Sequence, residues 1–394
     1  MTPKANVIVR KESSQATLQT MLRERMLLAI RATLIATLEE EIEAFVAASF
    51  YKHEPQRRDH RNGYYARNLG TSLGEIEDLP VPRSRKGFRT QLFERYQRRQ
   101  AELDGSILDM FVNGISTQKV GDTLGKLAGI NPSPSTVSRV FHTLDGEFET
   151  WKKRPLKAHY LYVFADGTYF TVIYEGVGCK MPIIAVVGID ESGQREVLGF
   201  SVGERENQDA WEQLLEELKT RGVQTIDLWI TDGNQAMLNA VQAKFSASKR
   251  QRCIKHKMDN ILGYVPEKQQ EQVRLELRSI FYQVNRQKAV EAAAAFQLKY
   301  ESVYPTAIEC MKRDWEACLT FYDFPEKHWK FIRTTNIIER LFGEVKKRTH
   351  KMAAAFRNED SCLLMFYAIV RSLKFRKISI PASQPATPAN LHNS

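Results

Sequence analysis

The sequence predicts an α/β protein in which a mixed sheet follows a mainly helical N-terminal region. From Tyr160 onward, short β-branched and aromatic runs alternate with turns and then with a helix, which is typical of a sheet containing a crossover. Before Tyr160 the apolar residues recur at helical spacing, and beyond His256 the pattern is almost wholly helical as far as Tyr322. The chain has 394 residues, 43% of them hydrophobic. By length it should form about two to three domains.

These changes of pattern divide the chain into seven predicted segments. They are an N-terminal helical segment (1–50), a basic segment (51–100), a candidate helix-turn-helix (101–157), the first part of the α/β core (158–257), an all-α insertion (258–330), helices that complete the core (331–378), and a tail rich in Pro, Ala and Ser (379–394). Residues 1–16 lack apolar periodicity, so we expect a mobile arm there and disorder in the tail. The apolar stripe from Leu18 to Val46 predicts one long helix or a helical hairpin, and it serves as core or as a dimer face.

The bulk composition argues against several classes of protein. The chain has no apolar run of about 18 residues and no charged-then-apolar leader, which argues against membrane insertion and secretion. We therefore expect a cytoplasmic protein. Its five cysteines are odd in number and lack paired spacing, which argues against a disulfide framework. The net charge of +10 points toward a polyanionic partner.

Basic residues crowd into residues 51–100, where aromatic residues alternate with them. A charge run is often only a solvated surface, but the dominance of arginine and the interleaved rings favour contacts with phosphates. The candidate DNA-binding residues here are Arg57, Arg58, Arg61, Arg83, Arg85, Lys86 and Arg89, and Lys346, Lys347 and Arg348 form a second cluster near the C-terminus.

Two short helices joined by a tight turn are predicted further along the chain. Residues 104–113 and 116–127 have helical patterns, and a Gly-Ile-Asn-Pro-Ser-Pro turn leads into a helix from Ser135. Ser116 and Ser135 are the expected N-caps. An ordinary helical hairpin gives the same pattern, but the basic neighbourhood favours a DNA-binding helix-turn-helix. Its candidate contacts to phosphates or base edges are Ser135, Thr136, Ser138 and Arg139.

Two of the predicted strands lead into carboxylates. Residues 160–164 precede Asp166, and residues 225–231 precede Asp232. Strands are also predicted at 169–174, 183–189 and 196–202, with an Asp-Gly turn after the first run and a crossover helix at 207–221. A single Asp before Gly is most often a turn residue. A parallel pairing of the two acid-bearing strands would instead place Asp166 and Asp232 side by side.

Adjacent carboxylates repel one another unless a cation lies between them, and their hard oxygen ligands suit Mg²⁺ or Mn²⁺. Two such ions, roughly 3.5 to 4 Å apart, can activate a water or a 3′-hydroxyl at a phosphodiester and stabilise the leaving oxygen. A third acid is needed, and Glu339 is the best candidate because it lies in the first turns of a helix with strong capping residues at Thr334, Thr335 and Asn336. Glu344 is about 140° further round that helix and should face away.

Cys253 and His256 are metal-ligand residue types at a usable spacing. Zinc needs a second pair of ligands, and the sequence shows no matching pair nearby. A role beside the active site, with His256 hydrogen-bonded to a carboxylate or phosphate, is favoured over a zinc site.

Several stretches together resemble one known family. They are Ala165-Asp166-Gly167, residues 207–222 with Trp211, Thr231-Asp232-Gly233, Gln251-Arg252-Cys253 with His256, and Thr334 to Arg340. They resemble the Mutator-type transposases of bacterial insertion sequences, which are DDE enzymes with a ribonuclease H-like core. The resemblance implies that Asp166, Asp232 and Glu339 are a catalytic triad that holds two Mg²⁺ or Mn²⁺ ions. Cys253, His256, Asn336 and Arg340 are interpreted as supporting that active site.

The resulting hypothesis is a DNA transposase that binds the terminal inverted repeats of its element, hydrolyses phosphodiesters at the ends and catalyses strand transfer. The alternatives are a metal-dependent DNA nuclease or resolvase without strand transfer, and a non-catalytic DNA-binding regulator. Double-stranded DNA, as element ends and target, is the expected partner. Because two ends must be brought together, a homodimer or larger assembly is expected on DNA, with residues 18–46 as a candidate interface.

Overall fold

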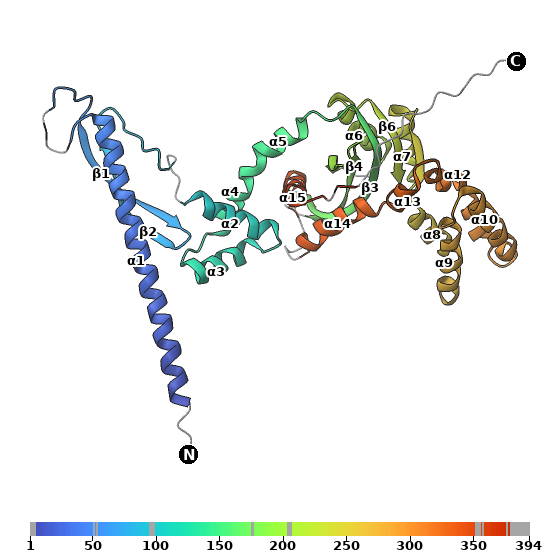
Figure 1. Cartoon of the computed structure of the whole chain (residues 1–394), viewed down its shortest axis with the longest axis horizontal. Helices are drawn as coiled ribbons and strands as arrows, with labels where there is room; N and C mark the ends of the chain where they lie inside the picture. Colours follow the sequence, from blue (N-terminus) through green and yellow to red (C-terminus); the bar gives the residue numbers. More distant parts are fainter. Residues whose placement is uncertain are drawn as a thin grey trace. The chain divides into compact units, whose positions relative to one another are not determined.

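The computed structural model describes residues 5–49, 52, 54–93, 99–174, 177–202, 207–350, 356, 358–375 and 377–378. The chain divides into two compact units, Met1–Thr143 and Leu144–Ser394 (Figure 1). The tail expected at residues 379–394 lies outside the described residues. No helix in the described part of the chain has both the length and the apolar character needed to cross a membrane.

The first unit begins with one continuous helix, α1 (Ala5–Val46), of 42 residues. The mobile arm expected at residues 1–16 is therefore wrong from Ala5 onward. The reason is that Ala, Arg, Lys, Glu and Gln are good helix formers, which extend an existing helix without an apolar face. The hairpin of β1 (Arg61–Thr71) and β2 (Gly74–Ser84) packs along the C-terminal part of α1, where Leu38 is fully buried with Leu79 (Figure 1).

Three helices complete the first unit: α2 (Ala101–Val112), α3 (Thr117–Ala128) and α4 (Pro134–Phe141). They share one small core, to which Ile107, Val120 and Val137 each contribute a side chain with no exposed surface. The helices predicted around residues 104–113, 116–127 and from 135 are thus present, with boundaries shifted by one to three residues.

The N-caps of α3 and α4 test the predicted helix starts. Ser116 caps α3, since its side chain accepts a hydrogen bond from the backbone N–H of Lys119 at 3.4 Å. The prediction of Ser135 as the cap of α4 is wrong. Ser133 accepts from the N–H of Thr136 at 3.3 Å, and Pro134 is the first helical residue. Proline suits that position because its missing N–H has no partner there in any helix and its φ is already helical.

Replacement of Ser133 by alanine should loosen the first turn of α4. Loss of an N-cap costs about 1 kcal/mol, so we expect amide exchange in residues 134–141 to become roughly fivefold faster. Ser135→Ala is the matched control, since the Ser135 side chain caps no backbone group and contacts only the hydroxyl of Ser133, at 2.9 Å. Hydrogen exchange followed by mass spectrometry measures both. Equal acceleration in the two variants would show that Ser133 is not the cap.

The second unit contains a five-stranded mixed sheet of order β5-β4-β3-β6-β7, so the predicted α/β class is confirmed. The strands are β3 (His159–Tyr174), β4 (Val177–Ile189), β5 (Arg195–Val202), β6 (Thr225–Thr231) and β7 (Lys249–Arg252). Strands β3, β4 and β5 pair antiparallel, whereas β6 pairs parallel with β3, and β7 pairs parallel with β6.

The Asp-Gly turn expected within the first strand is absent. Strand β3 runs straight through Asp166 and Gly167, which pair with Ala185 and Ile184 of β4. A local turn signal fails here because the partner strand holds the backbone extended at every one of these positions. On the other side of β3, pairing with β6 ends at Ala165 and Thr231. Asp166 therefore lies within β3 but just beyond the end of β6.

Helices cover both faces of the sheet. On one face, α6 (Gln208–Thr220) and α7 (Gln235–Lys244) contribute Trp211 and Met237, respectively, to the core that also contains Val163 and Ala165 of β3. On the other face, α14 (Asn336–Thr349) contacts β3 and β4, and α15 (Glu359–Ser372) contacts β5. Helix α5 (Asp145–Lys153) joins this second face, where the ring of Phe148 stacks on that of Phe200 at 5.8 Å.

Residues 254–332 are almost wholly helical, as the sequence pattern predicts. The helices are α8 (Ile254–Leu262), α9 (Glu267–Phe281), α10 (Arg286–Tyr300), α11 (Pro305–Lys312), α12 (Trp315–Leu319) and α13 (Glu326–Ile332). In Figure 1, α8, α9, α10 and α12 lie near one another in the second unit, and α12 packs directly against β7. These helices separate Asp232 from Glu339 in the sequence. Helix α14 nevertheless packs on the sheet, at β3 and β4.

Candidate active site

The register of the sheet brings Asp166 and Asp232 to neighbouring positions. Ala165 of β3 pairs with Thr231 of β6 in a parallel ladder, and each aspartate is the next residue along its strand. Asp166 is held in β3, where its Oδ1 accepts from the N–H of Gly167 at 2.9 Å. Asp232 follows the last residue of β6, and its Oδ1 accepts from the N–H of Asn234 at 2.8 Å.

The alternation of side chains along β3 directs Asp166 toward helix α14. Ala165 belongs to the core beneath α6 and α7, so Asp166 and Thr168 lie on the opposite face. The ammonium group of Lys346, on α14, donates to the hydroxyl of Thr168, which places α14 over that face. Glu339 is the fourth residue of α14.

Burial and neighbouring charge make Asp166 an unusual carboxylate. Only 7% of its surface is exposed. Its pKa is raised to about 7, first by burial and then by the negative charge of Asp232, with a smaller contribution from Glu339. The positive charge of His256 opposes these effects. Asp166 is therefore repelled by both Asp232 and Glu339, and His256 faces the same space.

Thr335 connects Glu339 with the start of α8. Its hydroxyl contacts Glu339 Oε1 at 3.1 Å, Cys253 Sγ at 3.2 Å and His256 Nδ1 at 3.4 Å. Thr335 is the N-cap residue of α14, within the predicted capping stretch, but its side chain makes no capping hydrogen bond. The hydroxyl is instead occupied by side chains from α8 and α14. The other oxygen of Glu339, Oε2, is ion-paired with Lys255.

Cys253 and His256 lie beside Glu339, and the ligand atoms of the three residues are all within 4.8 Å of one another. A hydrogen bond to Cys253 raises the pKa of His256 to about 9, outweighing its burial, and the charges of Asp166 and Glu339 act in the same direction. The pKa of Cys253 is lowered, because hydrogen bonds from His256 outweigh the effect of burial. The pair places a positive imidazolium among the carboxylates. The same three residues also form a possible ligand set for a metal ion.

Arg252, the residue before Cys253, packs against the turn that carries Asp232. It ends β7, pairs with Thr231, and is only 8% exposed. Within the described part of the chain, no hydrogen-bond partner is found for its Nε and Nη1. Gly233, with a φ of +82°, makes room for it: a Cβ added there would lie 1.6 Å from Nη1 of Arg252. A buried guanidinium therefore lies against Gly233, the residue that follows Asp232.

The remaining predicted residues near α14 have varied positions. Asn336 and Arg340 are exposed, and the charge of Arg340 adds to the burial that lowers the pKa of Arg195. Lys347 is exposed, whereas Arg348 pairs with Glu344 at 2.7 Å. Glu344 therefore takes an ion-pair partner of its own on α14.

A basic groove in the first unit contains several of the predicted DNA-binding residues. Its volume is about 1290 Å³, and its lining includes Arg67, Arg83, Lys86, Arg89, Tyr65, Phe88 and Phe93. The guanidinium of Arg83 lies 4.9 Å from the centre of the Tyr65 ring. Buried Asp59 fixes the groove wall, because its carboxylate accepts from the N–H groups of His60 at 2.7 Å and Lys86 at 2.9 Å.

The other predicted residues of the first unit do not line this groove. Arg57, Arg58, Arg61 and Arg85 lie outside the groove lining, and Arg61 is ion-paired with Glu39 at 2.5 Å. On α4, Ser135 and Arg139 are exposed, while Thr136 and Ser138 are half-buried.

Comparison with known proteins identifies the family. The family model described as "Transposase, Mutator family" matches residues 3–377. This chain belongs to the Mutator family of transposases. The transposase for insertion sequence element ISRM5 of Rhizobium meliloti (strain 1021) is 32% identical over 341 residues, covering 86% of this chain and 85% of the relative. The transposase for insertion sequence element IS256 in transposon Tn4001 of Staphylococcus aureus is 31% identical over 340 residues, covering 85% and 86%.

A solved structure of a simian T-cell lymphotropic virus intasome in complex with the PP2A regulatory subunit B56 gamma is 12% identical to this Mutator-family chain. The match covers 43% of this chain and 70% of the matched chain in that complex. Its TM-score of 0.18 is too low to support an inference about the fold.

Three side chains of this Mutator-family site were not predicted from the sequence to belong to it: Arg252, Lys255 and Thr335. Arg252 and Thr335 lie inside motifs that the sequence does show, Gln251-Arg252-Cys253 and Thr334 to Arg340. Their roles depend on contacts between α8, β7 and α14, which no local pattern encodes. Lys255 stands between Cys253 and His256, and its spacing alone gives no sign of its ion pair with Glu339.

Proposed function

We propose that this chain catalyses DNA transposition at the site formed by Asp166, Asp232 and Glu339. The observation that carries the proposal is the register of β3 and β6, which sets Asp166 and Asp232 side by side on the face where α14 carries Glu339. Membership of the Mutator family supports the proposal. The two relatives named above are transposases for insertion sequences by name.

The donor set suits divalent cations. Burial and the carboxylates of Asp232 and Glu339 raise the pKa of Asp166, so the three acids offer hard oxygen ligands. The charge repulsion on Asp166 falls when a cation binds. Asp166, Asp232 and Glu339 are the residues that would hold two Mg²⁺ or Mn²⁺ ions. When bound, such a pair activates the attacking water or 3′-hydroxyl and stabilises the leaving oxygen.

The protein's own groups around the carboxylates orient them. Thr335 donates to Glu339, and Lys255 neutralises the oxygen of Glu339 that Thr335 does not contact. The positive charge on His256 favours the ionised form of Asp166. His256 and Lys255 are also cations that a scissile phosphate would meet beside the acids, whereas a zinc site would require His256 to be neutral.

The architecture of the second unit supports a ribonuclease H-like core. Three antiparallel strands followed by a crossover helix and a parallel strand place the acids on β3 and after β6. The helices α9–α13 are the proposed insertion between Asp232 and Glu339. We propose residues 101–157 as the helix-turn-helix region and residues 258–330 as the insertion.

The first unit is the proposed DNA-binding apparatus. Helices α3 and α4 share a core with α2, which fits a helix-turn-helix with α4 as the recognition helix. The basic groove would grip phosphates of the element ends. Exposed Leu18, Leu22 and Met26 on α1 are the proposed contact with a second copy, in an assembly that holds two ends in the cytoplasm.

The decisive experiment supplies DNA that carries the element's own terminal repeats, together with Mg²⁺. The proposed function predicts nicks with free 3′-hydroxyls at the ends and joined products when a pre-cut end is offered with a target duplex. Cleavage without joining would assign the protein to the nucleases or resolvases. Binding without either reaction would identify a DNA-binding regulator.

Removal of two groove arginines should weaken DNA binding without regard to sequence. Arg83 and Arg89 are exposed in the groove, so the double variant Arg83→Ala/Arg89→Ala should bind duplex DNA about tenfold more weakly. Each lost phosphate contact lowers the slope of log affinity against log salt by about 1, so the slope should fall by about 2. Fluorescence anisotropy across a salt series measures both quantities.

The matched control for this measurement is Lys219→Ala/Lys244→Ala, which makes the same charge change on α6 and α7 of the second unit. It should leave affinity and salt slope nearly unchanged. Equal losses in the two double variants would mean that the groove makes no special contribution to DNA binding.

A further inference from the structure

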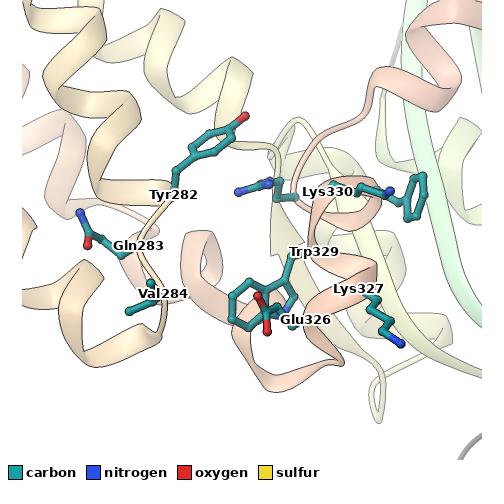
Figure 2. Close-up of a pocket in the computed structure, with 9 residues that line it drawn as sticks. Tyr282, Gln283, Val284, Glu326, Lys327, Trp329 and Lys330 are labelled. Atoms are coloured by element: carbon teal, nitrogen blue, oxygen red, sulfur yellow. The ribbon is translucent and has the colours of Figure 1, made fainter. Parts of the chain in front are cut away.

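A second cavity, outside the carboxylate site, lies between the loop that follows α9 and helix α13. Its volume is about 570 Å³, within the range of roughly 300–1,000 Å³ that is usual for ligand pockets. Figure 2 shows Tyr282 and Val284 of the loop on one side and Trp329 of α13 on the other. Lys327, Lys330 and Arg333 also line it.

The aromatic side chains of Tyr282, Trp329 and Phe331 line this cavity. Trp329 is held in place because its indole N–H donates to the carbonyl of Phe324 at 2.7 Å and its ring packs edge-on against Tyr322 at 4.8 Å. Tyr282 is 49% exposed, and the guanidinium groups of Arg333 and Arg278 lie 3.9 and 5.0 Å from the centre of its ring. A ring that is already immobilised loses little conformational entropy when a ligand stacks on it.

The charge of the lining favours an anion. The lining contains three cationic side chains and one carboxylate, that of Glu326. Arg333 is fixed in the wall, since its guanidinium lies 3.9 Å from the centre of the Tyr282 ring and donates to the carbonyl of Phe281 at 3.2 Å. Lys327 and Lys330 are exposed, and the ammonium of Lys330 lies 4.8 Å from the centre of the Phe331 ring. Rings that accept bases together with cations that accept phosphates are the pattern of single-strand recognition.

The wall of the cavity is continuous with the carboxylate site. The carbonyl of Arg333 accepts from the N–H of Ile254, at the start of α8, at 2.9 Å. Two residues later, Thr335 contacts Glu339, Cys253 and His256. One short segment thus forms the edge of both sites. We propose that this cavity binds an unpaired nucleotide of the DNA substrate next to the bond that is cleaved.

This inference rests on the proposed function for the identity of the substrate, but its test does not depend on catalysis. The assay uses the full chain and a fluorescein-labelled single-stranded oligothymidine, with anisotropy as the readout. Trp329→Leu should weaken binding roughly tenfold or more, the effect of losing one stacked base. Lys327→Ala/Lys330→Ala, which changes only exposed side chains, should lower the salt slope by about 1.4.

Lys288→Ala/Lys299→Ala supplies the matched charge control, because both lysines are exposed on α10 and ion-paired with Glu291 and Glu276. It should bind the oligothymidine like the parent. Parent-like binding by both Trp329→Leu and Lys327→Ala/Lys330→Ala would overturn the inference. The inference would also be overturned, in favour of an acidic protein segment, by two results together. Polyglutamate would displace the oligothymidine, and Trp329→Leu would bind the oligothymidine with the same affinity as the parent.

A cross-linking experiment places the nucleotide. Element-end DNA carrying 5-iododeoxyuridine at each position beside the cleaved bond in turn is irradiated with the parent protein. The inference predicts a cross-link to Trp329 or Tyr282 from one of these positions, found by mass spectrometry. Cross-links only to other residues would overturn it. Failure of end cleavage by the parent, with oligothymidine binding still dependent on Trp329, would instead count against the proposed function alone.

Discussion

Asp166→Asn should abolish DNA cleavage and joining while making the metal-free protein more stable. We expect the cleavage rate to fall on the order of 10³-fold or more, since a ligand that contributes several kcal/mol to the transition state is lost. The free energy of unfolding should rise by about 1–3 kcal/mol, because the neutral amide removes a buried charge that Asp232 repels. The amide oxygen can still accept the hydrogen bond from Gly167.

The two effects have opposite signs, which separates a catalytic role from damage to the fold. Cleavage of end-containing DNA in Mg²⁺ and thermal unfolding in a chelator measure them on the same sample. Glu344→Gln is the control, since that carboxylate is paired with Arg348 on α14, and its loss should cost only a few tenths of a kcal/mol. Undiminished Mg²⁺-dependent cleavage by Asp166→Asn would refute the proposed triad.

Much of the fold could be predicted because its signals are local or follow from connection rules. Short apolar runs, turns and a crossover helix were enough to predict a mixed sheet with β6 parallel to β3. The errors occurred where a tertiary or positional effect overrides the local signal. Gly167 is extended because β4 pairs with it, and Pro134 moves the N-cap from Ser135 to Ser133.

The same distinction applies to the candidate site: some of its residues follow from local signals, and others depend on tertiary contacts. The neighbouring positions of Asp166 and Asp232 follow from the apolar runs that precede them and the direction of a crossover, both visible in the sequence, although β3 continues past Asp166 to Tyr174. Thr335 does occupy the predicted N-cap position of α14, but its hydroxyl contacts Glu339, Cys253 and His256 instead of capping the helix. That choice depends on how α8 and α14 approach one another. Contacts between residues so far apart in sequence cannot be inferred from either stretch alone.

Gly233 shows how closely the backbone beside Asp232 is constrained. Its φ of +82° is strained for any residue with a Cβ, and that Cβ would lie 1.6 Å from Nη1 and 2.3 Å from Cζ of Arg252. Arg252 is buried, so its guanidinium has little space to move. The turn and the arginine therefore fix the position of Asp232 together.

We expect Gly233→Ala to lower the free energy of unfolding by about 2–5 kcal/mol, the combined cost of a left-handed alanine and an overpacked contact. DNA cleavage should fall as well, because Asp232 is displaced. Thermal unfolding measures the first effect and cleavage of end-containing DNA the second. Gly343→Ala is the control: it lies in α14 with nothing within 4 Å of the added Cβ, so it should gain up to about 1 kcal/mol.

The double variant Gly233→Ala/Arg252→Ala separates the two causes. Removal of the guanidinium relieves the overpacked contact but leaves the unfavourable φ. The double variant should therefore be more stable than the sum of the two single losses predicts, by about 1–3 kcal/mol. Strict additivity would mean that Arg252 moves aside freely and that backbone strain alone limits residue 233. Coupling would instead show that Arg252 and Gly233 position Asp232 as a unit.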